Sequence, residues 1–181
     1  SNSNIAALNA GHAFGETMEV SGETSAYTVS AAEIAPGLYR TVTGIDALSW
    51  GLVTAAQKAG LRMTFAGYPI TPASAILHTL SKLKQFDVVT FQAEDEIAAV
   101  CAAVGGSYAG TLGVTASSGP GIALKTEAIG LAISVELPLV VINVQRAGPY
   151  TGLPTKTEQS DLYQAVYGRN ADSPLPVVAA R

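Results

Sequence analysis

A continuous apolar run, Pro138-Leu-Val-Val-Ile-Asn-Val144, constrains the fold of this chain more than any other stretch. A strand with one face in water alternates apolar and polar residues. A strand of a parallel sheet is covered on both faces and has a nearly unbroken apolar sequence. The run therefore predicts a central strand of a parallel sheet.

Three other expected strands precede this run, and helical patterns separate the four. The strands are expected at 62–66, 87–91 and 111–116, and the helices at 44–60, 73–83, 94–108, 122–135 and 156–167. β-branched and aromatic residues favour strands, whereas apolar residues three or four apart favour helices. The alternation predicts an α/β fold, with a doubly wound, mostly parallel sheet and helices on both of its faces.

Residues 1–42 have a different character from the rest of the chain. They lack sustained periodicity and are rich in Ser, Thr, Gly, Ala and Glu. Such a composition is typical of a linker or an extended N-terminal arm. We expect little regular structure there, apart from a short strand near 27–29. The folded domain would then span 43–181 and end in a strand at 176–179.

The composition excludes several classes of protein. Ten basic and fourteen acidic residues give a net charge of -4, and no basic run marks a nucleic-acid-binding surface. Cys101 is the only cysteine of the 181 residues, so the chain itself provides no disulfide and no thiolate-bound zinc or iron–sulfur cluster. His12 and His78 do not suggest a metal centre.

The apolar content allows two further expectations. The chain has no secretory signal and no apolar run of about 18 residues, so we expect a soluble cytoplasmic protein without a membrane partner. Only 13% of its residues are charged, against about 25% in a typical soluble domain. Part of its apolar surface should therefore meet another subunit.

Polar or small residues follow each of the four expected strands. They are Thr71, Glu94, the loop Ser117-Ser-Gly-Pro-Gly121, and Arg146. In open α/β sheets, ligands bind just past the carboxyl ends of the strands, so these positions should share one edge. Each also has a purely structural explanation. Thr71 can cap a helix, Glu94 can stabilise a helix N-terminus, the loop can be a plain turn, and Arg146 can form a salt bridge.

Four motifs occupy these positions in order. They are Gly67-Tyr-Pro-Ile-Thr-Pro-Ala-Ser74, Phe91-Gln-Ala-Glu-Asp-Glu-Ile97, Thr115-Ala-Ser-Ser-Gly-Pro-Gly121, and Gln145-Arg-Ala-Gly-Pro149 with Gly152-Leu-Pro-Thr-Lys-Thr-Glu-Gln-Ser-Asp161. From about Thr43 onward, the chain resembles the alpha subunit of 2-oxoacid:ferredoxin oxidoreductases, and the 2-oxoglutarate branch more than the single-chain pyruvate enzymes. The resemblance implies a thiamine diphosphate enzyme that decarboxylates a 2-oxoacid, transfers the acyl group to coenzyme A and passes electrons to ferredoxin.

The resemblance also implies roles for individual residues. Glu94 matches the glutamate that hydrogen-bonds the aminopyrimidine ring and so promotes loss of the thiazolium C2 proton. Thr71 matches a substrate-contacting threonine, and Arg146 matches the arginine that pairs with the substrate carboxylate, a task suited to a bidentate guanidinium. Positions near the cofactor are matched by Pro69, Ile70, Ser117, Ser118 and Gly119.

The chain departs from the family in what it lacks. The Gly-Asp-Gly motif that holds diphosphate and magnesium is missing, as are the cluster cysteines. The resemblance places both in a beta subunit, so this chain would be the pyrimidine-binding half of a shared active site, with an alpha–alpha contact as well. We also expect a truncated C-terminus, and we interpret residues 1–42 as a linker from a fused gamma domain.

Two alternatives stay open. One is a subunit of a non-oxidative thiamine diphosphate-dependent decarboxylase or synthase, which shares loops of the Ser-Gly-Pro-Gly type. The other is a binding domain without catalytic activity.

Overall fold

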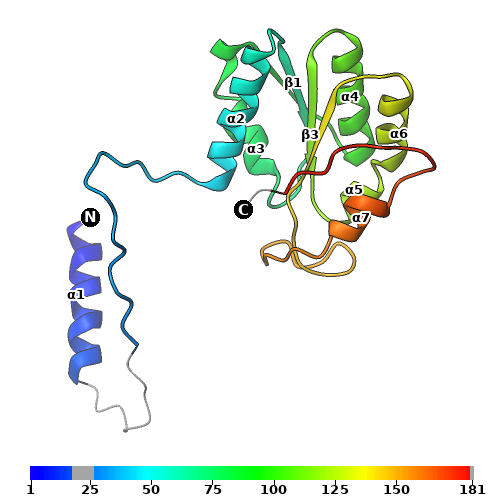
Figure 1. Ribbon diagram of the computed structural model, residues 1–181. Helices are drawn as coiled ribbons and strands as arrows, with labels where there is room; N and C mark the ends of the chain where they lie inside the picture. Colours follow the sequence, from blue (N-terminus) through cyan, green and yellow to red (C-terminus); the bar gives the residue numbers. More distant parts are fainter. Residues whose placement is uncertain (18–26, 180–181) are drawn as a thin grey trace. The chain divides into compact units, whose positions relative to one another are not determined.

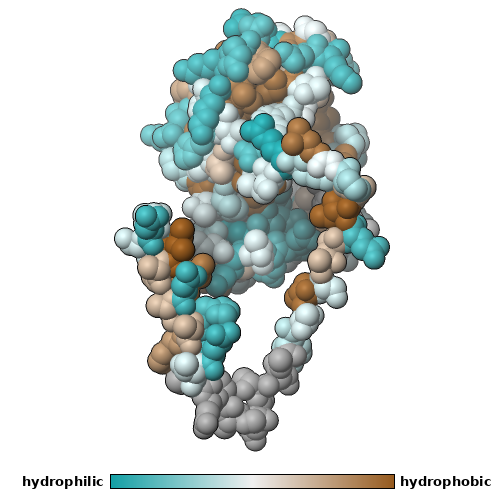
Figure 2. Space-filling model, turned by 90° about the vertical axis from the view of Figure 1, so that its left-hand side faces the viewer, coloured by the Kyte–Doolittle hydropathy of each residue, from teal (hydrophilic) through white to brown (hydrophobic). Residues whose placement is uncertain are grey.

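The computed structural model describes residues 1–17 and 27–179, which belong to two compact units, Ser1–Arg40 and Thr41–Arg181. The first unit contains α1 (Asn2–Thr17), none of whose residues is buried. Apolar residues lie open on the surface of this unit (Figure 2), among them Ile5, Leu8 and Phe14.

The prediction of little regular structure in residues 1–42 was wrong for α1. The helix has no buried face, so no period of apolar residues marks it, and its alanines supply only local helix propensity. The strand expected at 27–29 does not form. The interpretation of this segment as a linker stays a prediction.

The second unit is a four-stranded parallel sheet between two layers of helices. Its strands are β1 (Met63–Gly67), β2 (Val88–Gln92), β3 (Leu112–Ser117) and β4 (Leu139–Asn143). Its helices are α2 (Gly44–Lys58), α3 (Ser74–Leu80), α4 (Glu96–Tyr108), α5 (Pro120–Ala123), α6 (Thr126–Ser134) and α7 (Leu162–Tyr167), with a 3-10 turn η1 (Lys84–Phe86). α2 and α3 lie on one face of the sheet and α4 and α6 on the other (Figure 1). The predicted doubly wound α/β fold is confirmed. The prediction of a central strand at 138–144 was wrong for the described sheet, because β4 lies at one edge of it and all five of its residues are half-buried.

The core depends on large side chains in some places and on very small ones in others. Phe65 of β1 and Ile76 of α3 are fully buried members of the main apolar cluster. α4 packs on β1 and β3 through alanines such as Ala99 and Ala103. A Cβ on Gly113 of β3 would lie 2.2 Å from the carbonyl oxygen of Ala103. Glycine at this position therefore allows the close approach of helix and strand.

The strand order β2-β1-β3-β4 contains one reversal of winding direction. The chain passes from β1 outward to β2, then crosses back over β1 to β3 and continues to β4. Because crossovers between parallel strands are right-handed, the reversal places the connecting helices on opposite faces. Ligands of doubly wound domains bind at such a switch point, here at the carboxyl ends of β1 and β3.

Several helices differ from the sequence prediction. The helix expected at 122–135 is interrupted by a turn at Leu124 and Lys125, which separates α5 from α6. The helix expected at 73–83 ends at Leu80, and the one expected at 156–167 begins only at Leu162. No strand forms at 176–179. Across residues 1–17 and 27–179, no helix is long and apolar enough to span a membrane.

Candidate functional site

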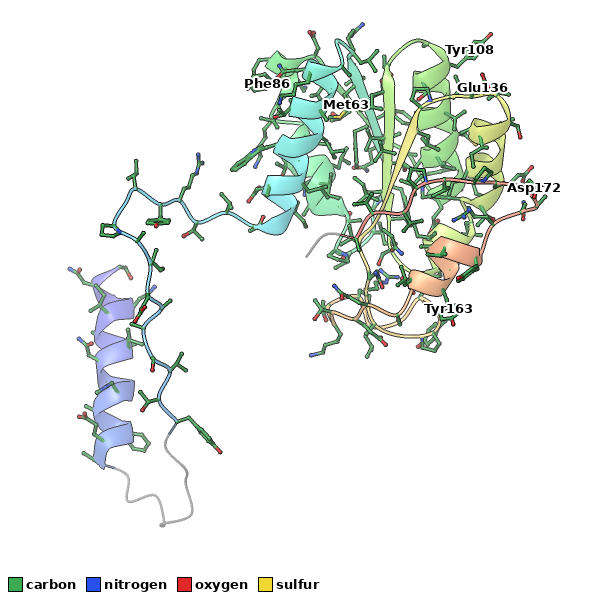
Figure 3. The ribbon with its side chains drawn as sticks, viewed as in Figure 1. Met63, Phe86, Tyr108, Glu136, Tyr163 and Asp172 are labelled. Atoms are coloured by element: carbon green, nitrogen blue, oxygen red, sulfur yellow. The ribbon has the colours of Figure 1, made fainter. Side chains whose placement is uncertain are left out.

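The four predicted loops lie at the carboxyl edge of the sheet, which we call the rim. Met63, at the start of β1, lies at one end of the sheet, and Tyr163 of α7 lies at the other end (Figure 3). Gly67 at the end of β1 is in register with Gln92 at the end of β2, and the last residues of β3 and β4 are likewise paired. The strand ends are therefore level, and the segments that follow them meet at one edge.

Glu94 stands at the rim just before α4. The preceding residue, Ala93, is held by its N–H, which donates to the carbonyl oxygen of Gly67 at 2.7 Å. The helix is capped by Asp95, whose Oδ1 accepts from the N–H of Ala98 at 2.8 Å. The Glu94 side chain is exposed and makes no hydrogen bond or ion pair with any described residue. Helix capping therefore accounts for Asp95 but not for Glu94. Because Asp95 is the N-cap, α4 begins at Glu96 and not at Glu94.

Arg146, which follows β4, is brought together with Thr71. The arginine is only 7% exposed, and its Nη1 donates to the carbonyl oxygen of Thr71 at 2.7 Å. Its Nε has no partner, and no carboxylate of the described residues lies within 4.0 Å of the guanidinium. The salt-bridge explanation is therefore not realised in the described part of the chain. A buried cation without a counter-charge is costly, so this arrangement favours an anionic ligand.

Thr71 does not cap α3, contrary to the structural explanation offered from the sequence. The N-cap position is Ala73, which forms no side-chain cap. Ser74 holds this turn instead, because its Oγ accepts from the N–H of Ile70 at 2.8 Å and donates to the Ile70 carbonyl at 2.9 Å. The Thr71 side chain and the neighbouring Pro69 remain exposed at the rim, while Ile70 packs against the core.

The loop after β3 is tightly built. Ser117 is fully buried, and its Oγ shares a 2.7 Å hydrogen bond with the Tyr68 hydroxyl. Ser118 is also fully buried, but its Oγ has no partner. Gly119 has a φ of +40°, which disfavours residues with a Cβ. A Cβ on Gly121 would lie 2.1 Å from the Ser117 Oγ. The loop is therefore more than a plain turn, since its packing depends on both glycines.

Lys125 is one of two residues of this region that sequence reasoning missed. It is fully buried, and its Nζ donates to the Glu96 carbonyl at 2.9 Å and to the Thr115 Oγ1 at 3.2 Å. Nζ also lies 5.3 Å from the centroid of the Tyr68 ring. Burial lowers the pKa of Lys125 to about 8, although the carboxylates of Glu96 and Asp95 oppose the shift. The only signal in the sequence is a lone lysine within an otherwise mostly apolar helical stretch.

Tyr68, also missed, lies between β1 and this lysine. It is 7% exposed. Burial raises the pKa of its phenol well above the usual value, the hydrogen bond from Ser117 lowers it, and the nearby Glu96 carboxylate raises it further. The phenol therefore stays protonated over the working range of most enzymes and serves as a neutral hydrogen-bonding group.

Four buried polar atoms near the ends of β3 and β4 lack a partner among the described residues. They are Ser118 Oγ, Asn143 Oδ1, Arg146 Nε and Asp161 Oδ2. The Asp161 backbone N–H is fixed by Gln145 Oε1 at 2.9 Å. Native structures satisfy nearly all buried polar atoms, so unpaired ones mark places where water or a ligand completes the bonding. No group of three His, Cys, Asp or Glu side chains in residues 1–17 and 27–179 is placed to hold a metal ion.

These features define a doubly wound α/β domain whose rim offers an unengaged carboxylate, a buried guanidinium and unpaired hydroxyls to a polar cofactor. Residues 54–181 match the family described as "Pyruvate flavodoxin/ferredoxin oxidoreductase, thiamine diP-bdg". The chain belongs to this thiamine diphosphate-binding family, which confirms the family that the four motifs indicated.

Several relatives are close in sequence. The chain is 60% identical over 178 residues to the 2-oxoglutarate oxidoreductase subunit KorA of Mycobacterium tuberculosis, an alignment that covers 98% of this chain and 27% of the relative. It is 48% identical over 128 residues to the 2-oxoglutarate synthase subunit KorA of Archaeoglobus fulgidus, which covers 70% of this chain and 37% of that one.

A solved structure shares the fold. The 2-oxoglutarate:ferredoxin oxidoreductase from Magnetococcus marinus, with 2-oxoglutarate, coenzyme A and succinyl-CoA bound, matches with a TM-score of 0.65 and 44% identity, over 74% of this chain and 23% of that one. The chain thus spans between about a quarter and two-fifths of the length of these relatives. The 178-residue alignment includes most of residues 1–42, where the four motifs have no counterpart.

Proposed function

We propose that this chain is the pyrimidine-binding part of the alpha subunit of a 2-oxoacid:ferredoxin oxidoreductase, with residues 43–181 as the cofactor-binding domain. Its reaction is the oxidative decarboxylation of a 2-oxoacid to an acyl-CoA, with electrons passed to ferredoxin. The favoured substrate is 2-oxoglutarate, because the relatives from M. tuberculosis and A. fulgidus are both named as 2-oxoglutarate enzymes.

The observation that carries the proposal is the state of Glu94. It is the residue that the resemblance matches to the cofactor-binding glutamate, and it lies exposed at the carboxyl edge of the sheet without a partner among the described residues. A carboxylate in a structural role would be engaged by the helix N-terminus, as Asp95 is. Glu94 is instead free to hold a proton shared with a ring nitrogen of the cofactor.

The other rim residues fit the same ligand and its substrate. Arg146 has unused donors for a carboxylate, and its Nη1 bond to the Thr71 carbonyl holds the loop that carries the Thr71 hydroxyl. Ser118 Oγ and Gly119, with Pro69 and Ile70, would line the pyrimidine ring. Thiamine diphosphate, held by these residues, would supply a nucleophilic carbon for the carbonyl carbon of the 2-oxoacid, and its thiazolium ring would take up the electron pair left by departing carbon dioxide.

The remaining parts of the active site would come from a partner. A beta subunit would carry the diphosphate and magnesium site and the iron–sulfur cluster, and ferredoxin would take the electrons from it. The support is the resemblance, together with the absence from these 181 residues of the Gly-Asp-Gly motif and of a second cysteine. An alpha–alpha contact belongs to the same proposal.

The test uses the subunit that contains this chain, assembled with its beta partner. The 2-oxoglutarate- and coenzyme A-dependent reduction of a viologen dye is measured for wild type, Glu94→Gln and Glu94→Ala. Both variants should lose about 100-fold or more in kcat, the usual scale for an acid–base group, with unchanged melting temperature. Glu136→Gln, an exposed glutamate between α6 and β4, is the matched control and should keep full activity.

Near-normal turnover of Glu94→Ala would refute the proposal. Release of carbon dioxide without dye reduction in the wild-type complex would favour the non-oxidative class instead.

A further inference from the structure

Lys125 is a fully buried cation without an ion-pair partner among the described residues. Its three direct contacts are with neutral groups: the Glu96 carbonyl, the Thr115 hydroxyl and the Tyr68 ring. The carboxylates of Glu96 and Asp95 favour its charged form from beyond ion-pair distance, but they offset only part of the effect of burial. Removing an ammonium from water costs several kcal/mol unless a counter-charge and hydrogen bonds offset it. Packing alone does not explain the lysine, because an apolar side chain of similar length would fill the same space without this cost.

The local backbone is arranged so that the lysine points inward. α5 ends at Ala123 and α6 begins at Thr126, so that Lys125 lies in the turn between the two helices. Its own N–H donates to the Ile122 carbonyl, and its carbonyl accepts from the N–H of Ile129. A continuous helix, as the sequence predicted, would lack this turn. The break is thus the feature that directs Lys125 into the interior.

Lys125 connects the segments that form the central part of the rim. Thr115 belongs to β3, Tyr68 follows β1, and Glu96 is the first residue of α4 after β2. The carbonyl of Glu96 is two residues from Glu94, within the turn that the Asp95 cap makes rigid. The lysine therefore fixes the position and orientation of the segment that carries Glu94, relative to the ends of β1 and β3.

We propose that Lys125 is a positioning residue, which holds the first turn of α4 so that the Glu94 carboxylate meets the cofactor in one orientation. This inference rests on the function proposed for Glu94. It assigns no chemical step to Lys125, whose ammonium is enclosed by protein groups. Its effect should appear in kcat, because a displacement of about 1 Å at a reacting group can cost about 100-fold in rate. Substrate affinity should change less, because Arg146 and Thr71 lie on other loops.

The experiment compares Lys125→Met with Lys84→Met in the assembled complex. Lys84 is exposed in η1, before β2 and so at the edge of the sheet opposite the rim. Two readouts are taken: hydrogen exchange of the amides of residues 94–98, and kcat and KM for 2-oxoglutarate. Lys125→Met should speed exchange of these amides about tenfold and lower kcat at least tenfold, with KM changed less than about threefold. Lys84→Met should change neither.

A second variant keeps the test decisive if Lys125→Met does not fold. Thr115→Val removes the hydroxyl acceptor but keeps the lysine and the side-chain shape, so it should change exchange at 94–98 and kcat in the same direction by a smaller factor. Unchanged exchange and kcat in the folded Lys125→Met, or in Thr115→Val if only that variant folds, would overturn the inference.

The outcomes also separate this inference from the proposed function. An inactive Glu94→Ala beside a fully active Lys125→Met would overturn the role of Lys125 alone. Full activity of Glu94→Ala would remove the proposed function, and the positioning role of Lys125 would fall with it.

Discussion

Single residues at the rim divide into those that hold the fold and those that are left free. Of the acids that precede and begin α4, Asp95 caps the helix and Glu94 does not. Two buried cations occur among the described residues. Lys125 donates hydrogen bonds to protein groups, whereas Arg146 keeps an unpaired Nε. Residue type alone does not show this division. It follows from which donors and acceptors each side chain can reach.

The buried ammonium of Lys125 predicts a pH dependence of stability. Its pKa falls from 10.5 to about 8 on folding because burial disfavours the charged form. Between these values the unfolded chain binds more protons than the folded chain, so the free energy of unfolding rises with pH. The full shift corresponds to an energy on the order of 3 kcal/mol. Urea unfolding of the chain from pH 8 to 10 should show this rise in wild type and not in Lys125→Met.

The unfolding free energies of wild type and Lys125→Met are best compared below pH 10. The pKa of Tyr68 is raised by burial, so the stability that its neutral phenol contributes is lost above the ordinary value of 10.0. Parallel pH profiles for wild type and Lys125→Met would contradict the prediction.

Arg146 should be sensitive to the shape of its cation as well as to its charge. Arg146→Lys keeps the charge but removes the planar fork that can hold a carboxylate with two bonds. We expect KM for the 2-oxoacid to rise about tenfold or more in the assembled enzyme, as measured by steady-state kinetics. Arg62→Lys, an exposed arginine just before β1, should leave KM unchanged. A normal KM for Arg146→Lys would place Arg146 outside the substrate site.

At the scale of secondary-structure elements, strands were easier to predict than helices. The four strands lie within one residue of their expected positions, because runs of β-branched, aromatic and other apolar residues mark them in the sequence. This holds even for β2 and β4, which are edge strands and only partly buried. The break between α5 and α6 was missed because it depends on Lys125 reaching Glu96, Thr115 and Tyr68, which are distant in sequence. α1 was missed for a different reason, since none of its residues is buried and burial therefore imposes no apolar period on it.

The candidate site could likewise be predicted only in part from the sequence. Glu94, Arg146 and the Ser117–Gly121 loop could be placed at the rim because ligands of open sheets bind where strands end. Tyr68 and Lys125 could not, because their importance comes from contacts between loops. The roles of the predicted residues toward a ligand remain proposals.

The close packing of α5 against the ends of β1 and β3 gives a prediction for Gly121. An added Cβ would meet the Ser117 Oγ at 2.1 Å and the Tyr68 hydroxyl at 2.4 Å, two atoms that already bond each other. Gly121→Ala should therefore lower the free energy of unfolding by about 1 to 3 kcal/mol. Gly105→Ala in α4, where an added Cβ would meet no atom within 4 Å outside the backbone of its own helix, should raise it by about 0.5 to 1 kcal/mol. Equal melting temperatures for the two variants would contradict this account.

At the scale of the whole molecule, apolar surface remains open around the candidate site. Phe91 of β2 and Ile97 of α4 are exposed on either side of Glu94. Farther along α4, toward its C-terminus, an apolar hollow of about 400 Å³ lies between α4 and α6 and is lined by Cys101, Tyr108 and Leu131, among others. Part of the exposed apolar surface that the low charge fraction predicted therefore lies on the α4 side of the sheet.

The proposed division of the active site predicts how activity depends on assembly. The 181-residue chain alone, supplied with thiamine diphosphate, magnesium, coenzyme A and 2-oxoglutarate, should reduce no viologen, since it provides only the rim described above. The subunit that contains it should become active when the beta subunit is added, with dye reduction as the measurement. Turnover by the isolated chain would show that the diphosphate end of the cofactor needs no second protein.

The exposure of Cys101 has a practical consequence. It is the only thiol in these 181 residues, it is open to solvent, and it lies in the second turn of the helix that follows Glu94. A maleimide dye would therefore label a single, known position close to the proposed chemistry. Its fluorescence could report in real time when another protein covers that helix, without any engineered mutation.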